Sequence, residues 1–261
     1  MIRALSNAAS GMKAQELNID ILSNNLANVN TAGYKKSRAE FADLLYEART
    51  KPGAPSPSGS PLPSGQEIGN GVRAVATYKR FTGGELRETS NPLDIAIEGK
   101  GFFQVMQPDG STTYSRAGIF KTNASGEVVN ADGYPLQPSI SIPADATSIT
   151  ISENGVVSVT LGGNLDQVEV GQLQLVTFAN PAGLSSLGRN LYAQTPASGQ
   201  PAITSPGEEG AGKLLQGFVE SSNVQVVSEM IELIAAQRAY EINAKVIKAA
   251  DEMLQQTTRL G

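Results

Sequence analysis

The chain has 261 residues and a formal net charge of -5 at pH 7, and it contains neither cysteine nor histidine. Without cysteine there are no disulfides, thiolate metal sites or cysteine nucleophiles, and without histidine the commonest general base and metal ligand is missing. Aromatic residues make up only 5% of the sequence, whereas glycine occurs 27 times. We therefore expect an elongated, turn-rich molecule with modest cores and more than one domain.

A narrow apolar stripe predicts a helix over residues 2–28. Its members recur at alternating steps of three and four residues, which is the spacing of a coiled-coil interface. Asn28, Thr31 and Gly33 then offer the turn chemistry that ends a helix. The stripe consists of Leu5, Ala8, Met12, Gln15, Ile19, Leu22, Leu26 and Val29.

A second helix is predicted over residues 222–261, because this segment has no proline and no glycine before Gly261. Both terminal helices need a partner, so we predict that residues 1–31 and 222–261 pair as one coiled-coil domain. In the monomer they are expected to be largely disordered, because closing a loop of about 200 residues gains little until neighbours bury the stripes. The second helix has two apolar rows, Ala235, Ala239, Ile242, Val246, Ala249 and Met253, and Val226, Met230, Leu233, Tyr240, Ala244, Ile247 and Leu254.

Residues 51–66 are rich in proline and glycine, which excludes a helix or a central strand. Alternating apolar residues from Ile68 to Tyr78 then predict a strand, so we interpret the run as the tip of a long hairpin arm. The alternative is a flexible linker. The arm is assigned to a discontinuous connecting domain of residues 32–82 and 196–221. Its prolines are Pro52, Pro55, Pro57, Pro61 and Pro63.

Short strands separated by turn residues predict a central antiparallel all-β domain over residues 83–195. Turn signals recur at Gly110, Gly118, Gly126 and Gly133, and Asn154-Gly155 suits a two-residue hairpin turn. A further strand is expected over residues 168–178. The predicted fold class is therefore α+β, with paired terminal helices, an extended arm region and a β domain.

Charge is distributed unevenly, since residues 93–206 contain four basic and nine acidic residues and so carry the whole imbalance. Basic residues this sparse speak against nucleic acid as a partner. We interpret the short cluster Lys35, Lys36 and Arg38 as a solvated surface and not as a phosphate site.

The sequence contains no phosphate-binding, dinucleotide-binding or zinc-protease motif, so no catalytic, cofactor-binding or metal-binding residue is predicted and we do not expect an enzyme. No apolar run is long enough to span a membrane. Residues 1–31 also lack the layout of a signal peptide. If the protein is exported, we expect export without a cleaved signal peptide.

Three groups of segments resemble the signatures of the bacterial flagellar rod and hook family. They occur in the same order as in that family and together extend over nearly the whole chain, which makes the resemblance specific. The N-terminal signature is similar to residues 24–35, the central portion to residues 91–103, 114–120 and 133–137, and the C-terminal signature to residues 220–224 and 237–245.

This resemblance implies a helical polymer around an export channel, with the terminal helices as its inner tube and the β domain outside. The length and the proline-rich insert are most typical of subunits of the distal rod, and a proximal rod or hook-type subunit is the alternative. Implied partners are further copies, proximal rod proteins, the hook, hook-cap or rod-cap proteins, the peptidoglycan and outer-membrane rings and the type III export apparatus. The segment containing Asn25, Asn28, Thr31, Gly33 and Tyr34 becomes the joint between the inner tube and the outer domains.

Two other classes of protein fit parts of the sequence. An adhesin or carbohydrate-binding β domain would suit residues 93–195 but leaves the matching terminal helices unexplained. A protein that lies on a membrane surface would explain the helices, but its polar face should be more basic than Arg3 and Lys13 make it.

Overall fold

The computed structural model describes residues 2–53, 63–162 and 167–260, which form two compact units. Unit 1 contains residues 1–26, 37–78 and 226–261, and unit 2 contains residues 27–36 and 79–225. Residues 37–78 are thus grouped with the helices, and residues 196–221 belong to the unit that contains the β sheets. The division into three domains drawn from the sequence stays a prediction.

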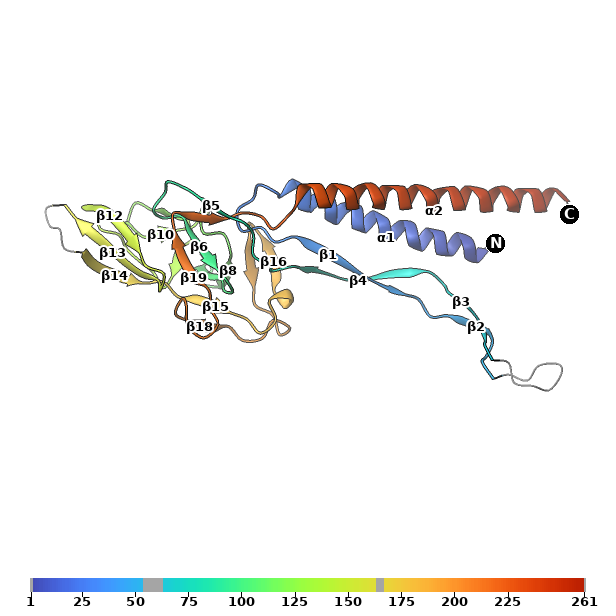
Figure 1. The fold of residues 1–261 in the computed structure, drawn as a ribbon, viewed down its shortest axis with the longest axis horizontal. Coiled ribbons are helices and arrows are strands. Elements are labelled where there is room, and N and C mark those ends of the chain that lie inside the picture. Colours follow the sequence, from blue (N-terminus) through green and yellow to red (C-terminus); the bar gives the residue numbers. More distant parts are fainter. Residues whose placement is uncertain (1, 54–62, 163–166, 261) are drawn as a thin grey trace. The chain divides into compact units, whose positions relative to one another are not determined.

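Unit 1 contains two long helices, α1 (Ile2–Ala27) and α2 (Val226–Leu260), which run in opposite directions along one another (Figure 1). Their bounds lie close to those predicted from the apolar spacing. The N-terminus of α2 carries Glu229 in its first turn, where a carboxylate interacts favourably with the helix dipole. Among the described residues no helix is long and apolar enough to cross a membrane.

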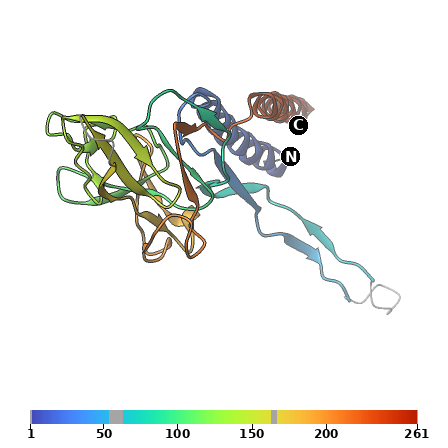
Figure 2. The same ribbon diagram turned by 60° about the vertical axis from the view of Figure 1, so that its left-hand side comes forward.

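The same unit contains a long antiparallel hairpin, visible in Figures 1 and 2. Its inner strands β1 and β4 pair, its outer strands β2 and β3 pair with Glu47 opposite Ile68, and Leu44 donates its N–H to the Gly71 carbonyl at 2.9 Å. Pro52 and Pro63 lie beyond the outer strands, whereas Pro55, Pro57 and Pro61 lie outside the described residues. The strands are β1 (Ser37–Asp43), β2 (Glu47–Thr50), β3 (Gln66–Ile68) and β4 (Val72–Lys79).

Unit 2 consists mainly of short antiparallel strands, in agreement with the predicted central β region. Its largest sheet has the order β11-β7-β8-β17-β16, and β12, β13 and β14 form a second sheet. Strand β6 pairs with β19, and β5 pairs with β20, so the chain that returns toward α2 is built into this unit. The strands are β5 (Leu86–Glu88), β6 (Ile95–Glu98), β7 (Phe103–Met106), β8 (Thr112–Ser115), β9 (Lys121–Thr122), β10 (Val128–Val129), β11 (Leu136–Gln137), β12 (Ala146–Ile151), β13 (Val156–Leu161), β14 (Gln167–Gln172), β15 (Leu175–Thr177), β16 (Ser185–Gly188), β17 (Leu191–Ala193), β18 (Ala202–Thr204), β19 (Lys213–Gln216) and β20 (Phe218–Glu220), with a short 3-10 helix at Pro181–Gly183.

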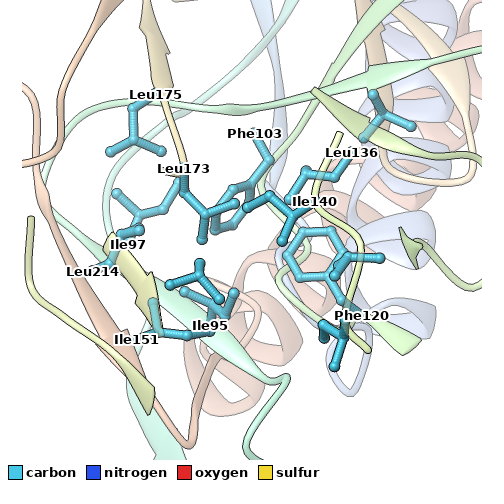
Figure 3. Packing of buried hydrophobic residues seen from close by; sticks show 14 of the residues in the cluster. Ile95, Ile97, Phe103, Phe120, Leu136, Ile140, Ile151, Leu173, Leu175 and Leu214 are labelled. Carbon is cyan, nitrogen blue, oxygen red and sulfur yellow. The ribbon is translucent and has the colours of Figure 1, made fainter. Parts of the chain in front are cut away.

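Two neighbouring phenylalanines divide the interior of unit 2 between two clusters. Phe103 packs edge to face on Phe120 at 5.1 Å in the main core, which Figure 3 shows together with Leu175 and Ile140. Phe102 belongs to a separate aromatic cluster with Tyr114, Val176, Phe178 and Tyr192. Because successive side chains in extended backbone point to opposite faces, one Phe-Phe pair can contribute to both clusters.

Four turns of unit 2 share one geometry, which corrects one prediction. In the turn after β12, Ser152 donates its N–H to the Val156 carbonyl at 2.9 Å, and only Gly155 has a positive φ. The loop therefore has three residues and not the predicted two, since a two-residue turn of that kind needs positive φ at Asn154 as well. The turns that end at Gly110, Gly126 and Gly133 repeat this pattern.

The prediction of a single strand over residues 168–178 is also wrong. The chain forms β14 up to Gln172 and then β15 from Leu175, and the two strands belong to different sheets. Leu173, which lies between them, is buried and belongs to neither strand. Its N–H donates to the Gly155 carbonyl at 2.7 Å.

Candidate functional site

The apolar row predicted on α2 lies largely on the surface of unit 1. Ile242 is 59% exposed, Val246 42% and Met253 50%, and Ala235 is exposed, whereas Ala239 is half-buried. Large apolar residues continue this surface toward the start of the helix. They are Val227, Met230, Ile231 and Ile234.

The opposite side of α2 is buried, and its residues are small or polar. Glu229, Ala236 and Ala250 are all nearly inaccessible and are spaced by multiples of seven residues. This heptad spacing places them on one face of the helix. Asn243 occupies the remaining position of the series and contacts α1, because a Cβ built on Gly11 would lie 2.9 Å from its Nδ2.

The stripe predicted on α1 is at least partly covered. Leu22 and Ala8 are buried, and the other predicted assembly residues are half-buried, namely Leu5, Met12, Ile19, Leu26 and Val29. An adjacent face of α1 contacts the hairpin. Asn7 donates its side-chain N–H to the Gly69 carbonyl at 3.1 Å, and Arg3 forms an ion pair with Glu47.

The predicted joint begins with a polar cluster around Asn25 in unit 1. The Asn25 amide donates to the Ser37 carbonyl at 2.9 Å and to Glu229 Oε2 at 3.1 Å, and its Oδ1 accepts the Ser37 N–H at 2.9 Å. Asn25 is almost fully buried. One side chain thus connects the end of α1, the first residue of β1 and the first turn of α2.

The remaining joint residues belong to unit 2. Thr31 donates its N–H to the Asn28 carbonyl at 3.1 Å and its hydroxyl to Asn28 Oδ1 at 3.2 Å. Gly33 has a φ of +68° and donates its N–H to the Glu220 carbonyl at 2.7 Å. A Cβ there would lie 2.6 Å from the Ala117 nitrogen, so only glycine fits. Tyr34 is buried, with the ammonium of Lys79 over its ring.

A buried charge cluster in unit 2 contradicts one interpretation of the sequence. Lys35, expected at a solvated surface, is 1% exposed, and its Nζ lies 2.6 Å from Glu220 Oε1. Arg116 Nε lies 2.7 Å from the other oxygen of the same carboxylate. Sequence patterning failed here because the aliphatic stem of a lysine packs inside a protein when a carboxylate meets its charge. We call Lys35, Arg116 and Glu220 the charge cluster.

Arg116 is held by backbone carbonyls in addition to Glu220. Its Nη1 donates to the Gly101 carbonyl at 2.6 Å, and its Nη2 donates to the carbonyls of Gly99 at 2.7 Å and Ile97 at 3.1 Å. Gly99 and Gly101 have φ angles of +121° and +135°, which side chains with a Cβ rarely adopt. The Gly-Lys-Gly turn therefore bends its carbonyl groups around the guanidinium.

The electrostatics of the cluster are set by burial and by its opposite charges. Burial lowers the pKa of Lys35 below its ordinary value, although the attraction of Glu220 partly opposes this effect. Burial alone would raise the pKa of Glu220, but Arg116 and Lys35 together hold that pKa below its usual range. Glu220 is therefore a carboxylate at neutral pH.

Three functional residues were missed by pattern reasoning, namely Arg116, Glu220 and Asn223. Asn223 accepts the Lys36 N–H at 2.8 Å and donates to the Arg80 carbonyl at 2.8 Å, so it connects the residue before β1 with the residue after β4. Arg116, Glu220 and Asn223 stand inside segments that carry the family resemblance. That resemblance was the signal that could have identified them, because their spacing along the chain gives none.

The described residues contain no group of three or more acidic side chains arranged to hold a metal ion. What the arrangement can do is connect segments of the chain and present apolar surface. The charge cluster brings together residues 35, 116 and 220, which lie far apart in the sequence.

Comparisons with known proteins agree with this description. Family models match at residues 5–35 (flagella basal body rod protein), 96–159 (flagellar hook protein FlgE/F/G D1 domain) and 215–260 (flagellar basal body rod FlgEFG protein C-terminal). The flagellar basal-body rod protein FlgG of Caulobacter vibrioides is 50% identical over 99% of both chains. Those of Agrobacterium fabrum and Borreliella burgdorferi are 49% and 46% identical over 97% of each chain. The chain belongs to the flagellar basal-body rod and hook family.

Proposed function

We propose that the chain is a structural subunit of the flagellar distal rod that polymerises helically into a rigid, hollow shaft and transmits motor torque to the hook. The observation that carries this proposal is the exposed apolar row on α2. Large apolar side chains at Val227, Ile231, Ile242 and Met253 are exposed on one helix of a chain whose relatives are rod proteins. Such a surface is costly in water and marks a contact with other chains.

Within each subunit, α1 and α2 pair as an antiparallel coiled coil of fixed register. Asn25 contacts Glu229, and Gly11 contacts Asn243. The number of residues from Gly11 to Asn25 on α1 equals the number from Glu229 to Asn243 on α2. That distance is two heptads, after which a coiled-coil interface repeats. The register then places Leu22 near Leu233 and Ala8 near Ile247.

This internal interface includes small and polar side chains, among them Asn25, Glu229 and Asn243. Buried polar groups at such positions specify register at a cost in stability. The paired helices therefore depend on neighbouring copies, which cover the exposed row of α2 and form the wall of the inner tube. We retain the predicted tube residues Leu5, Met12, Ile19, Leu22, Leu26, Val29, Ala235, Ala239, Ile242, Val246 and Met253 as this wall.

The register is testable by engineered disulfides, since the chain has no native cysteine. The pair Gly11→Cys with Asn243→Cys is expected to form an intramolecular disulfide in the assembled polymer, because the two positions are in contact. The matched control is Gly11→Cys with Ala236→Cys, which lies on the same face one heptad away. Predominant oxidation of the control pair would show that the register is wrong.

The polymer itself is tested by raising the concentration of purified protein and following sedimentation and electron micrographs. Straight, hollow filaments should form above a threshold concentration and disappear when residues 1–26 or 226–261 are removed. A chain that stays monomeric at all concentrations, or filaments that form without either helix, would contradict the proposal.

The partners that we propose for this shaft are further copies, proximal rod proteins, the hook, cap proteins, the peptidoglycan and outer-membrane rings and the type III export apparatus. A proximal rod or hook-type position is the second candidate. The length of the chain and the proline-rich insert after Lys51 favour the distal rod.

The hairpin arm is proposed to stiffen the polymer by lying on a neighbouring subunit. Two isolated strands are marginally stable in water, yet Leu45, Tyr46 and Val75 expose apolar surface on this arm. Proline-rich segments act as semi-rigid spacers, and we propose this property for the end of the arm, which contains Pro52, Pro55, Pro57, Pro61 and Pro63.

Shortening the arm tests this role. Thr50 pairs with Gln66, so replacing residues 51–65 by Asn-Gly should close a compact hairpin. We expect the resulting filaments to be curved or flexible, measured as a shorter persistence length in electron micrographs. Replacing the same residues by a Gly/Ser segment of the original length is the control for stiffness. Unchanged straight filaments from both variants would show that residues 51–65 act only as a linker.

A further inference from the structure

Unit 2 contains a pocket of about 190 Å³ beside the charge cluster. Its polar lining includes Lys35, Arg116 and the Gly-Lys-Gly turn, and its apolar lining includes Phe81, Phe102 and Phe178. The volume is below the roughly 300–1,000 Å³ of sites for drug-sized ligands. It is suited to a single side chain and not to a cofactor.

The groups around the pocket carry an excess of positive charge. Glu220 is the carboxylate that faces Lys35 and Arg116, and both of its oxygens are occupied. Its Oε1 accepts from Lys35 Nζ at 2.6 Å and from the Gly84 N–H at 2.8 Å, and its Oε2 accepts from Arg116 Nε. Two cations share one anion, and the exposed Lys100 adds a further positive charge at the rim.

Both buried cations also retain hydrogen-bonding capacity. The Lys35 ammonium has three N–H groups, of which two donate to Glu220 and to the Thr82 carbonyl. The Arg116 guanidinium has five, and four of them donate to Glu220 and to the carbonyls of Ile97, Gly99 and Gly101. Among the hydrogen bonds of the described residues, each cation thus keeps one donor.

The two remaining donors of the buried cations, and the one positive charge that Glu220 leaves unmatched between Lys35 and Arg116, match one carboxylate. A carboxylate supplies a single negative charge and two acceptor oxygens. The three phenylalanines around it would cover the methylene groups that carry it. A phosphate would bring three strong acceptor oxygens to the two remaining donors, and a neutral apolar side chain would leave the donors unpaired.

We propose that this pocket receives the carboxylate of a glutamate or aspartate side chain from a second copy of the chain. Charge complementarity selects this occupant, because residues 93–206 carry nine acidic against four basic residues and so offer acidic surface on every neighbouring copy. The proposal rests on the proposed polymer. It assigns to unit 2 a contact between subunits that is separate from the helices.

The chemistry of the pocket is tested first on the monomer, with sodium benzoate as the probe and benzamide as its neutral match. Amide resonances of Gly99, Gly101 and Phe178 should shift on titration with benzoate, with a Kd on the order of millimolar, and benzamide should leave them in place. Lys100→Glu should weaken the benzoate response several-fold without unfolding an exposed position. Equal shifts with both compounds, or none with benzoate, would overturn the site.

The identity of the occupant is tested in the polymer through Ala179, an exposed residue that lines the pocket. Ala179→Glu should place a carboxylate in the pocket from within the chain and raise the threshold concentration for assembly about tenfold. Ala179→Gln should assemble at a lower threshold concentration than Ala179→Glu. Equal thresholds for both variants, with benzoate still bound by the monomer, would overturn the second copy as occupant. Failure of the unmodified chain to assemble would instead refute the polymer, because the benzoate titration is independent of it.

Discussion

Replacing Glu220 by alanine is expected to destabilise unit 2 by about 3–5 kcal/mol, because it leaves Lys35 and Arg116 buried without their common anion. Urea unfolding followed by tyrosine fluorescence measures this loss. Glu153→Ala is the matched control, since Glu153 also pairs with a lysine at 2.7 Å but both partners are largely exposed. The control is expected to leave the midpoint unchanged.

The charge itself can be separated from the shape of the residue. Glu220→Gln keeps the size of the side chain but removes the anion, and so should be destabilised at neutral pH. The folded pKa of Glu220 lies below its unfolded value of about 4.3. The carboxylate therefore contributes stability that is present above about pH 4.3 and is lost as the pH falls through the folded pKa. The free energies of unfolding of the unmodified chain and of Glu220→Gln should converge in acid. A difference that stays constant with pH would contradict the ionic role of Glu220.

One further variant distinguishes a structural link from a net gain in stability. Lys35→Met and Arg116→Met combined with Glu220→Leu replace all three buried charged groups by apolar ones, which is often neutral or stabilising for a buried ion cluster. If this triple variant still folds like the unmodified chain, the cluster serves specificity, by fixing where residues 35, 116 and 220 meet. Loss of folding as severe as in Glu220→Ala would show that the ion pairs themselves hold the unit together.

Periodicity could predict the elements whose fold is local. The bounds of α1 and α2 follow from apolar spacing, and the repeated glycine turns of unit 2 follow from turn chemistry at Gly110, Gly126 and Gly133. The loop at Asn154 was wrong by one residue, because both two-residue and three-residue turns favour a glycine at the same place.

Residues that act through long-range contacts could not be predicted from spacing. Lys35 looked like part of a basic surface because its partner, Glu220, is distant in sequence. On α2 the two apolar rows were visible, but not which side meets α1. The large side chains are the conspicuous ones in a sequence, yet Glu229 and Asn243 contact α1, and the buried Ala236 lies on the same face of α2. A small or polar residue that is buried by a neighbouring helix gives no hydrophobic signal.

The second large effect is expected from Ile242→Lys, which should prevent polymerisation while leaving the monomer folded. Ile242 is 59% exposed in the chain, so a lysine is solvated there and unit 2 is untouched. In the proposed polymer the same position is covered by a neighbouring helix, where an unpaired ammonium costs several kcal/mol. Since about 1.4 kcal/mol corresponds to a factor of ten, the threshold concentration should rise by at least about two orders of magnitude.

The neighbouring exposed residue provides the control for this variant. Glu241→Lys changes the charge of the chain by more than Ile242→Lys does, but at a polar position of α2 beside Lys245 and Lys248. Sedimentation of both variants over a range of concentrations measures the threshold, and circular dichroism compares helix content before and after assembly. If the internal interface of α1 and α2 is weak, helix content should rise on assembly of the unmodified chain and stay low in Ile242→Lys. Polymerisation of Ile242→Lys at the unmodified threshold would mean that this row faces solvent in the shaft, and the wall of the tube would then have to be built from the α1 side.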